Sequence, residues 1–116
     1  MTEIDRAVLQ DIRAIGKVKG VEVLAKIAGM FLSEAPQLMQ KIQQAIVKAD
    51  PRSLRQNAHC LRSGALGVGA MHVAEICWKL EHASEPLDDA KVKLLFVELS
   101  VHWRAAADEL GSEAFD

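Results

Sequence analysis

The residue best suited to covalent chemistry is His59, which lies in the segment AHCLRSG at residues 58–64. At about 100° per helical residue, its side chain points roughly 140° away from the centre of an apolar seam. That seam consists of Leu54, Ala58, Leu61, Ala65 and Val68. Arg62 and Ser63 lie one turn after His59 and share its side of the predicted helix. Neutral imidazole is a competent nucleophile near physiological pH, so His59 is a candidate acceptor of a phosphoryl group.

The neighbours of His59 suit a phosphate group and an approaching partner protein. Arg62 can stabilise the charge of a phosphate through charge-assisted hydrogen bonds, and Ser63 is small and carries a hydroxyl. Gly64 costs a helix about 1 kcal/mol relative to alanine, which indicates either a need for close approach or early fraying of the helix. No outward cluster of carboxylates and no P-loop lysine accompanies these residues in the sequence. Any Mg²⁺ would therefore come from the partner, and we expect this chain to bind no cofactor itself.

Composition limits the classes of fold and function. The chain has 116 residues, the size of one compact domain, and half of them are apolar, enough to bury a core. A net charge of −2 and few aromatic residues (two Trp, three Phe, no Tyr) argue against nucleic-acid binding. Cys60 and Cys77 show no CxxC spacing, which favours a reduced, cytoplasmic setting. Because no apolar run approaches about 18 residues and no signal peptide is visible, we expect a soluble protein without membrane contact.

Helix signals extend along the whole chain, and strand signals are nearly absent. A first helix is predicted over residues 2–15, with Gly16 as its end. Its buried side is predicted to consist of Val8, Ile12 and Ile15. A long helical segment follows at residues 21–49, and Pro36 predicts a kink or short break near residues 33–36 because proline lacks the amide hydrogen that a helix interior needs.

The later helices have clearer boundaries. Asp50 followed by Pro51 is a strong helix start, with a capping aspartate before proline at the first helical position. Gly67 and Gly69 should end that helix, since both glycines tolerate positive φ. The last three helices are expected over residues 51–66, 70–84 and 88–110, and residues 111–116 should fray.

Four substantial amphipathic helices joined by short connections predict an all-α fold, an antiparallel four-helix bundle. The short extra N-terminal helix should lie across one end of this bundle. Residues 1–116 show no internal repeat, low-complexity segment or second domain, so we expect a single domain.

The segment that contains His59 resembles the signature of histidine-containing phosphotransfer (HPt) domains. That signature reads roughly A-H-x-L-K-G, then small residues, a glycine ten residues after the histidine, and a closing L-E. The matching residues of this sequence are Ala58, His59, Leu61, Gly69, Leu80 and Glu81. Upstream, FLSEAP at residues 31–36 resembles the F-x-x-E-x-P of the family. The resemblance covers residues 24–81 in detail, with Arg62 in place of the usual Lys and Ser63 in place of the usual Gly.

This resemblance implies a carrier in a multistep phosphorelay within a two-component system. A phosphorylated aspartate of a receiver domain would donate to His59, at Nε2, and the aspartate of another response regulator would collect the group. Such domains have no kinase activity, and the receiver brings the Mg²⁺. They occur free or as the C-terminal module of a hybrid sensor kinase, which would place this chain at the cytoplasmic end of a membrane-bound sensor. We expect a monomer.

The docking surface for receiver domains should surround His59. Gly64 and Gly69 are the small residues expected to permit close approach. The residues expected to contact the partner are Arg55, Gln56 and Leu66, with Phe31 and Met39 on the neighbouring long helix.

Two other functions remain open. One is a helical interaction module that docks receivers or another protein without accepting phosphate, against which the intact His59 and Arg62 argue. The other is the dimerising core of a histidine autokinase. Such cores usually carry an acidic residue directly after the histidine, where this chain has Cys60, and they need a nucleotide-binding domain, for which no motif is present.

We predict no metal site. The candidate ligands are the four histidines and two cysteines, and none is spaced four residues from another. For His72 we favour an ordinary surface position, with a position close to His59, across the glycine turn, as the alternative.

Overall fold

The computed structural model describes residues 2–19 and 23–115 of the chain. Within these ranges the protein is all-α, and its only strand-like pairing is a single bridge between Ile4 and Ala70. The helices are α1 (Arg6–Lys19), α2 (Val23–Val47), α3 (Pro51–Val68), α4 (Met71–His82) and α5 (Asp89–Phe115). None of the helices described combines the length and apolar character that crossing a bilayer requires.

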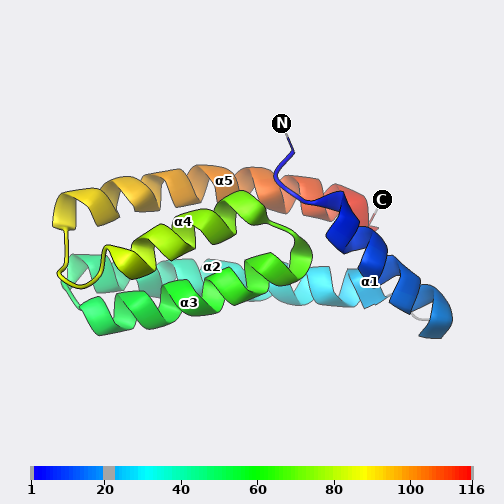
Figure 1. Ribbon diagram of the computed structural model, residues 1–116, viewed down its shortest axis with the longest axis horizontal. Coiled ribbons are helices and arrows are strands. Elements are labelled where there is room, and N and C mark those ends of the chain that lie inside the picture. The colour runs from blue at the N-terminus through cyan, green and yellow to red at the C-terminus, as the bar shows by residue number, and fades with distance from the viewer. Residues whose placement is uncertain (1, 20–22, 116) are drawn as a thin grey trace.

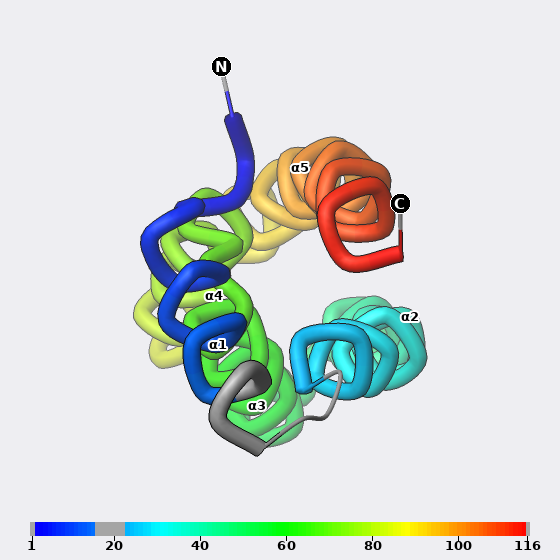
Figure 2. The backbone as a smooth tube through the Cα atoms, turned by 90° about the vertical axis from the view of Figure 1, so that its right-hand side faces the viewer, coloured from blue at the N-terminus to red at the C-terminus, as the bar shows by residue number. Residues whose placement is uncertain are grey.

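Helices α2 to α5 form an antiparallel four-helix bundle, and α1 lies across one end of it (Figure 1). Viewed along the bundle, α2 lies beside α3, α3 beside α4, α4 beside α5, and α5 beside α2 (Figure 2). Helix α1 packs on α2 and α3. The predicted fold class is therefore confirmed, including the extra helix across one end.

The apolar seam of α3 is buried as its spacing predicts. Its five residues, Leu54, Ala58, Leu61, Ala65 and Val68, are each no more than 1% exposed. The start of the helix is also as predicted, because the Asp50 side chain accepts a hydrogen bond from the backbone N–H of Ser53. Burial of the seam fixes the rotation of α3, and this rotation turns His59 outward.

Helix α2 is continuous, so the short break predicted near residues 33–36 as one of two alternatives is wrong, while the other alternative, a kink, stays a prediction. Pro36 lies inside the helix and removes one backbone hydrogen bond. Phe31, Ala35 and Met39 are nevertheless all buried along one side of α2. Packing of this stripe against the bundle offsets the lost hydrogen bond, since most helical stability in proteins comes from tertiary contacts.

The boundaries of the first and last helices differ from the predictions. Helix α1 begins at Arg6 and continues past Gly16. Among its described side chains, Ile12 is buried as predicted and Leu9 is buried as well, whereas Val8 is only partly buried and Ile15 is exposed. Helix α5 continues to Phe115, so the predicted fraying is wrong for residues 111–115, and residue 116 lies outside the described residues. Arg6 and Arg13 each pair with Glu113 at 3.2 Å, and these contacts fasten the last turns of α5 to α1.

Gly69 ends α3 with φ of 78°, whereas Gly67 stays within the helix. A Cβ at Gly69 would lie 2.8 Å from the backbone oxygen of Asp5. The backbone N–H of Asp5 donates to the Gly69 carbonyl at 2.8 Å. The close approach predicted for Gly69 is therefore made by the N-terminal segment of the same chain.

Candidate functional site

His59 lies on the solvent-facing side of α3, with 58% of its side chain exposed. Its Nδ1 is 3.0 Å from Oε1 of Glu81, which belongs to the neighbouring helix α4. A carboxylate only accepts hydrogen bonds, so the ring proton is assigned to Nδ1 and the lone pair to Nε2. The arrangement presents Nε2 as the nucleophilic atom of an exposed imidazole whose orientation is fixed by its other nitrogen.

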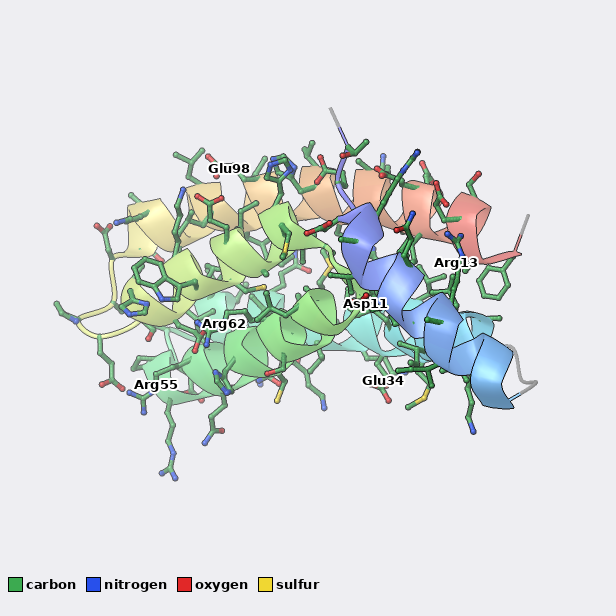
Figure 3. The ribbon with its side chains drawn as sticks, turned by 45° about the vertical axis from the view of Figure 1, so that its right-hand side comes forward. Asp11, Arg13, Glu34, Arg55, Arg62 and Glu98 are labelled. Atoms are coloured by element: carbon green, nitrogen blue, oxygen red, sulfur yellow. The ribbon has the colours of Figure 1, made fainter. Side chains whose placement is uncertain are left out.

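Glu81, the partner of His59, also forms an ion pair with Arg62. Arg62 Nε lies 3.4 Å from Glu81 Oε2, and the Glu81 side chain is only 12% exposed. Neither of these two buried atoms makes a hydrogen bond in the part of the chain that the structure describes. Each of the two atoms is therefore the other's charge partner, and removing one residue would leave the charge of the other without that partner. Figure 3 shows Arg62 beside α4, and Arg55 at the outer edge of α3.

Cys77 lies on α4 within the electrostatic reach of this ion pair and is fully buried. Burial raises the pKa of the Cys77 thiol to about 12, the Glu81 carboxylate acts in the same direction, and the Arg62 guanidinium opposes both. The thiol is therefore neutral at physiological pH, as is typical of a cysteine buried in a hydrophobic core.

The raised pKa of Cys77 predicts a loss of stability at alkaline pH. The thiol of the unfolded chain ionises from about pH 9, whereas the thiol of the folded protein keeps its proton to about pH 12. The contribution of the protonated thiol to the free energy of unfolding is therefore complete below pH 9 and is lost as the pH rises toward 12. Relative to Cys77→Ala, the wild-type free energy of unfolding should fall by about 1.4 kcal/mol per pH unit above 9. Urea unfolding at pH 8, 9 and 10 measures this difference. Cys60→Ala removes an exposed thiol and is the matched control, and parallel curves for wild type and Cys77→Ala would contradict the prediction.

Several residues predicted at the docking surface do face solvent around His59. Ser63, Gln56 and Leu66 are exposed on α3. Arg55 is half-exposed and pairs with Glu85 at 3.4 Å. A shallow surface depression beside the histidine is lined by Arg55, Gln56, Asn57, His59, Cys60 and Glu81.

Phe31 and Met39 are buried, at 6% and 9% exposure, so the prediction that they contact a partner is wrong. Both follow the apolar stripe of α2, and Phe31 packs edge-on against Trp103 of α5 with ring centroids 5.3 Å apart. A Cβ at Gly64 would lie 3.1 Å from Phe31 Cδ1. Gly64 therefore makes room for Phe31 between α2 and α3, and close approach at this glycine occurs inside the protein.

Sequence reasoning missed two residues of the site. The sequence indicates Glu81 only as the end of the L-E motif, because its contact with His59 joins two different helices. Trp78 is 48% exposed and stacks on His82 with ring centroids 3.8 Å apart. It lies one turn before Glu81 and so on the same flank of α4. Tryptophan is among the residues that contribute most to binding at protein interfaces.

The alternative prediction for His72, a position close to His59, is wrong. His72 Nδ1 lies 3.2 Å from Glu3, on the N-terminal segment. His72 and Glu81 are nine residues apart on α4, which places them on opposite flanks of that helix, since nine residues make about two and a half turns.

Together, the fold and the site define a helical bundle in which the exposed His59 of α3 is held at Nδ1 by Glu81, an acidic residue of the adjacent helix. Residues 26–113 match the family model described as the Hpt domain, and the chain belongs to this family. Hpt domains are phosphotransfer domains of phosphorelays and interact with receiver domains.

A solved structure has the same fold. It is the crystal structure of histidine-containing phosphotransfer protein B (HptB) from Pseudomonas aeruginosa PAO1, with a TM-score of 0.84 and 18% sequence identity. The similarity covers 97% of this chain and 94% of HptB. A comparison with curated protein sequences gave no match.

Proposed function

We propose that His59 is the phosphoryl acceptor and that the chain carries phosphate between receiver domains. The observation that carries this proposal is the contact between His59 Nδ1 and Glu81 at 3.0 Å on an otherwise exposed ring. This contact leaves Nε2 free to approach the aspartyl phosphate of a receiver. The Hpt family match over residues 26–113 supports the same assignment.

In the proposed reaction, the Nε2 lone pair attacks the phosphorus of the receiver's aspartyl phosphate. The P–N bond forms as the acyl P–O bond breaks, and the electron pair of that bond leaves with the aspartate carboxylate. The ring keeps its proton on Nδ1, and this N–H donates a hydrogen bond to the Glu81 carboxylate. The positive charge of the phosphorylated imidazole therefore faces a carboxylate. The reverse reaction delivers the group to a second receiver, and each receiver supplies the Mg²⁺ that its own aspartate requires.

Arg62 and Ser63 are the proposed contacts of the phosphoryl oxygens. The ion pair with Glu81 engages Nε of Arg62, and the terminal nitrogens of the guanidinium form the fork that suits phosphate oxygens. Ser63 is exposed one turn after His59 and can donate its hydroxyl hydrogen.

For the docking surface we propose Arg55, Gln56 and Leu66 of α3 together with Trp78 of α4. Leu66 is 46% exposed, and a receiver would cover it and Trp78 while it reaches His59. We further propose that the chain acts in the cytoplasm as a monomer, as a module of a hybrid sensor kinase or as a free carrier.

The test is to mix the purified protein with several phosphorylated receiver domains and to map the phosphate. The proposal predicts acid-labile, alkali-stable phosphate on the peptide that contains His59. Docking without any phosphate uptake would favour an interaction module. Incorporation of phosphate from ATP without a receiver would instead favour an autokinase core.

A further inference from the structure

Three potential metal ligands from distant parts of the sequence converge where α4 faces α5. Both imidazoles direct Nδ1 at one carboxylate oxygen: Glu3 Oε1 lies 3.2 Å from His72 Nδ1 and 3.0 Å from His102 Nδ1. The ligand atoms of the three side chains all lie within 4.8 Å of one another. The two rings are tilted by 57°, with centroids 5.1 Å apart.

These distances are close to those that a small metal ion requires. A tetrahedral ion with bonds of about 2.0–2.1 Å holds its ligand atoms about 3.3 Å apart. The two nitrogen–oxygen distances, 3.2 and 3.0 Å, are shorter than this by a few tenths of an ångström or less. Small side-chain movements would therefore admit an ion between the three atoms.

Glu3 is held in place although it lies near the start of the chain. Its backbone N–H donates to the Glu109 carboxylate at 2.8 Å. Ile4 is 1% exposed, and the backbone N–H of Asp5 donates to Gly69 at 2.8 Å. These contacts fix the N-terminal segment against α5 and the start of α4, so the carboxylate is positioned before any ion binds.

The cluster is also reachable from solvent. The side chains of His72 and His102 are 35% and 34% exposed, whereas that of Glu3 is 10% exposed. A surface depression lined by residues 2–6 with Met71 and His72 adjoins the cluster. An ion can therefore enter, and water can complete its coordination.

We propose that Glu3, His72 and His102 form a binding site for a divalent transition metal ion, with Zn²⁺ as the best-suited ion. Two imidazoles and one carboxylate favour Zn²⁺, Co²⁺ or Ni²⁺ over Mg²⁺ and Ca²⁺, which prefer oxygen ligands alone. To bind, each imidazole would turn its Nδ1 lone pair to the ion and carry its proton on Nε2.

The site is separate from His59. His72 lies on the opposite flank of α4 from Glu81 and about 14 Å from it along the helix axis. The ion would join the N-terminal segment to α4 and α5, and its role is to fasten that segment to the bundle. Spacing along the sequence does not indicate such a site, because Glu3, His72 and His102 come from three segments that only the fold brings together.

The experiment is a titration of the untagged protein with Zn²⁺ by calorimetry and with Co²⁺ by absorption spectroscopy. We expect one ion per chain, a rise in Tm of about 5 °C or more at saturating Zn²⁺, and Co²⁺ bands without thiolate charge transfer. The absence of that transition excludes the exposed Cys60 as the ligand.

Substitutions assign the ligands. His72→Gln, His102→Gln and Glu3→Gln should each weaken Zn²⁺ binding by at least about tenfold. His82→Gln removes an exposed histidine of the same helix and should leave affinity unchanged, as should His59→Gln. Circular dichroism verifies that each variant is folded. If a histidine variant does not fold, Glu3→Gln is used in its place to test whether Zn²⁺ binding depends on this cluster. The proposal is overturned if the wild type binds no Zn²⁺ at about 10⁻⁴ M free ion, a concentration at the weak end of protein metal sites. It is also overturned if each of the three single variants binds Zn²⁺ as tightly as the wild type. In either case the three side chains are a hydrogen-bonded cluster only.

Discussion

Replacing His59 by glutamine is expected to abolish phosphate uptake from every receiver, a fall in transfer rate of at least about 10³-fold. Glutamine keeps a polar side chain of similar reach and suits a helix, but its amide nitrogen has no nucleophilic lone pair. Because the His59 side chain is 58% exposed, the free energy of unfolding should change by no more than about 0.5 kcal/mol. Transfer from radiolabelled phosphoreceivers measures the first effect, and urea unfolding measures the second.

The matched control for this variant is His82→Gln. His82 is also an exposed histidine on a helix, with its Nδ1 2.8 Å from the backbone oxygen of Trp78. It has no acidic partner in the described part of the chain, and we expect His82→Gln to accept phosphate at the wild-type rate. Retained uptake by His59→Gln would refute the assignment of the acceptor. Loss of uptake in both variants would indicate a docking defect, which a direct receiver-binding measurement would detect.

The parts of the fold that were predictable are those set by local periodicity and local hydrogen bonds. The seam of α3 needs only the helical repeat, and the cap at Asp50 needs only the residue types at two positions. The continuity of α2 through Pro36 was not predictable in the same way. It depends on the burial of Phe31 and Met39 against other helices, and that burial outweighs one missing hydrogen bond.

The ends of the chain show the same limit. Residue types near Gly111 indicate a fraying end, yet Leu110 is fully buried and Glu113 pairs with Arg6 and Arg13 of α1. These contacts join residues about a hundred positions apart, and no short window of sequence contains both partners.

The outward direction of His59 was predictable for the same reason as the seam, since one helix determines both. Its partner Glu81 was not, because pairing depends on the register between α3 and α4. Gly64 and Gly69 illustrate a related ambiguity. Their small size indicated close approach, but only the packed structure identifies the neighbours as Phe31 and the Asp5 backbone within the same chain.

Removing the Glu81 carboxylate is expected to slow phosphotransfer without removing the acceptor. In Glu81→Ala, His59 loses the group that holds its proton on Nδ1, so the ring rotates and both neutral tautomers are populated. The transfer rate should fall by about 10²-fold, since substitutions that release a histidine from its orienting carboxylate have effects of this order or larger. Glu81→Gln keeps an oxygen acceptor but removes the charge, and we expect its transfer rate to be about tenfold lower than that of the wild type. Single-turnover transfer at saturating receiver measures both rates.

Glu81 also has a structural role, because it pairs with Arg62, and this role must be separated from its effect on His59. Loss of the carboxylate leaves Arg62 Nε, a buried atom, without its partner, and we expect both variants to lose about 1–3 kcal/mol of stability. The tautomer of His59, followed by ¹⁵N NMR, separates the two roles, because it should change in Glu81→Ala even where the protein remains fully folded. Glu75→Ala is the control, since Glu75 is an exposed acidic residue of α4 that pairs only with Lys79 among the described residues, at 3.6 Å. A Glu81→Ala variant that is folded, shows a changed tautomer and transfers at the wild-type rate would eliminate Glu81 as a positioning residue, and the reactivity of His59 would then rest on its exposure alone.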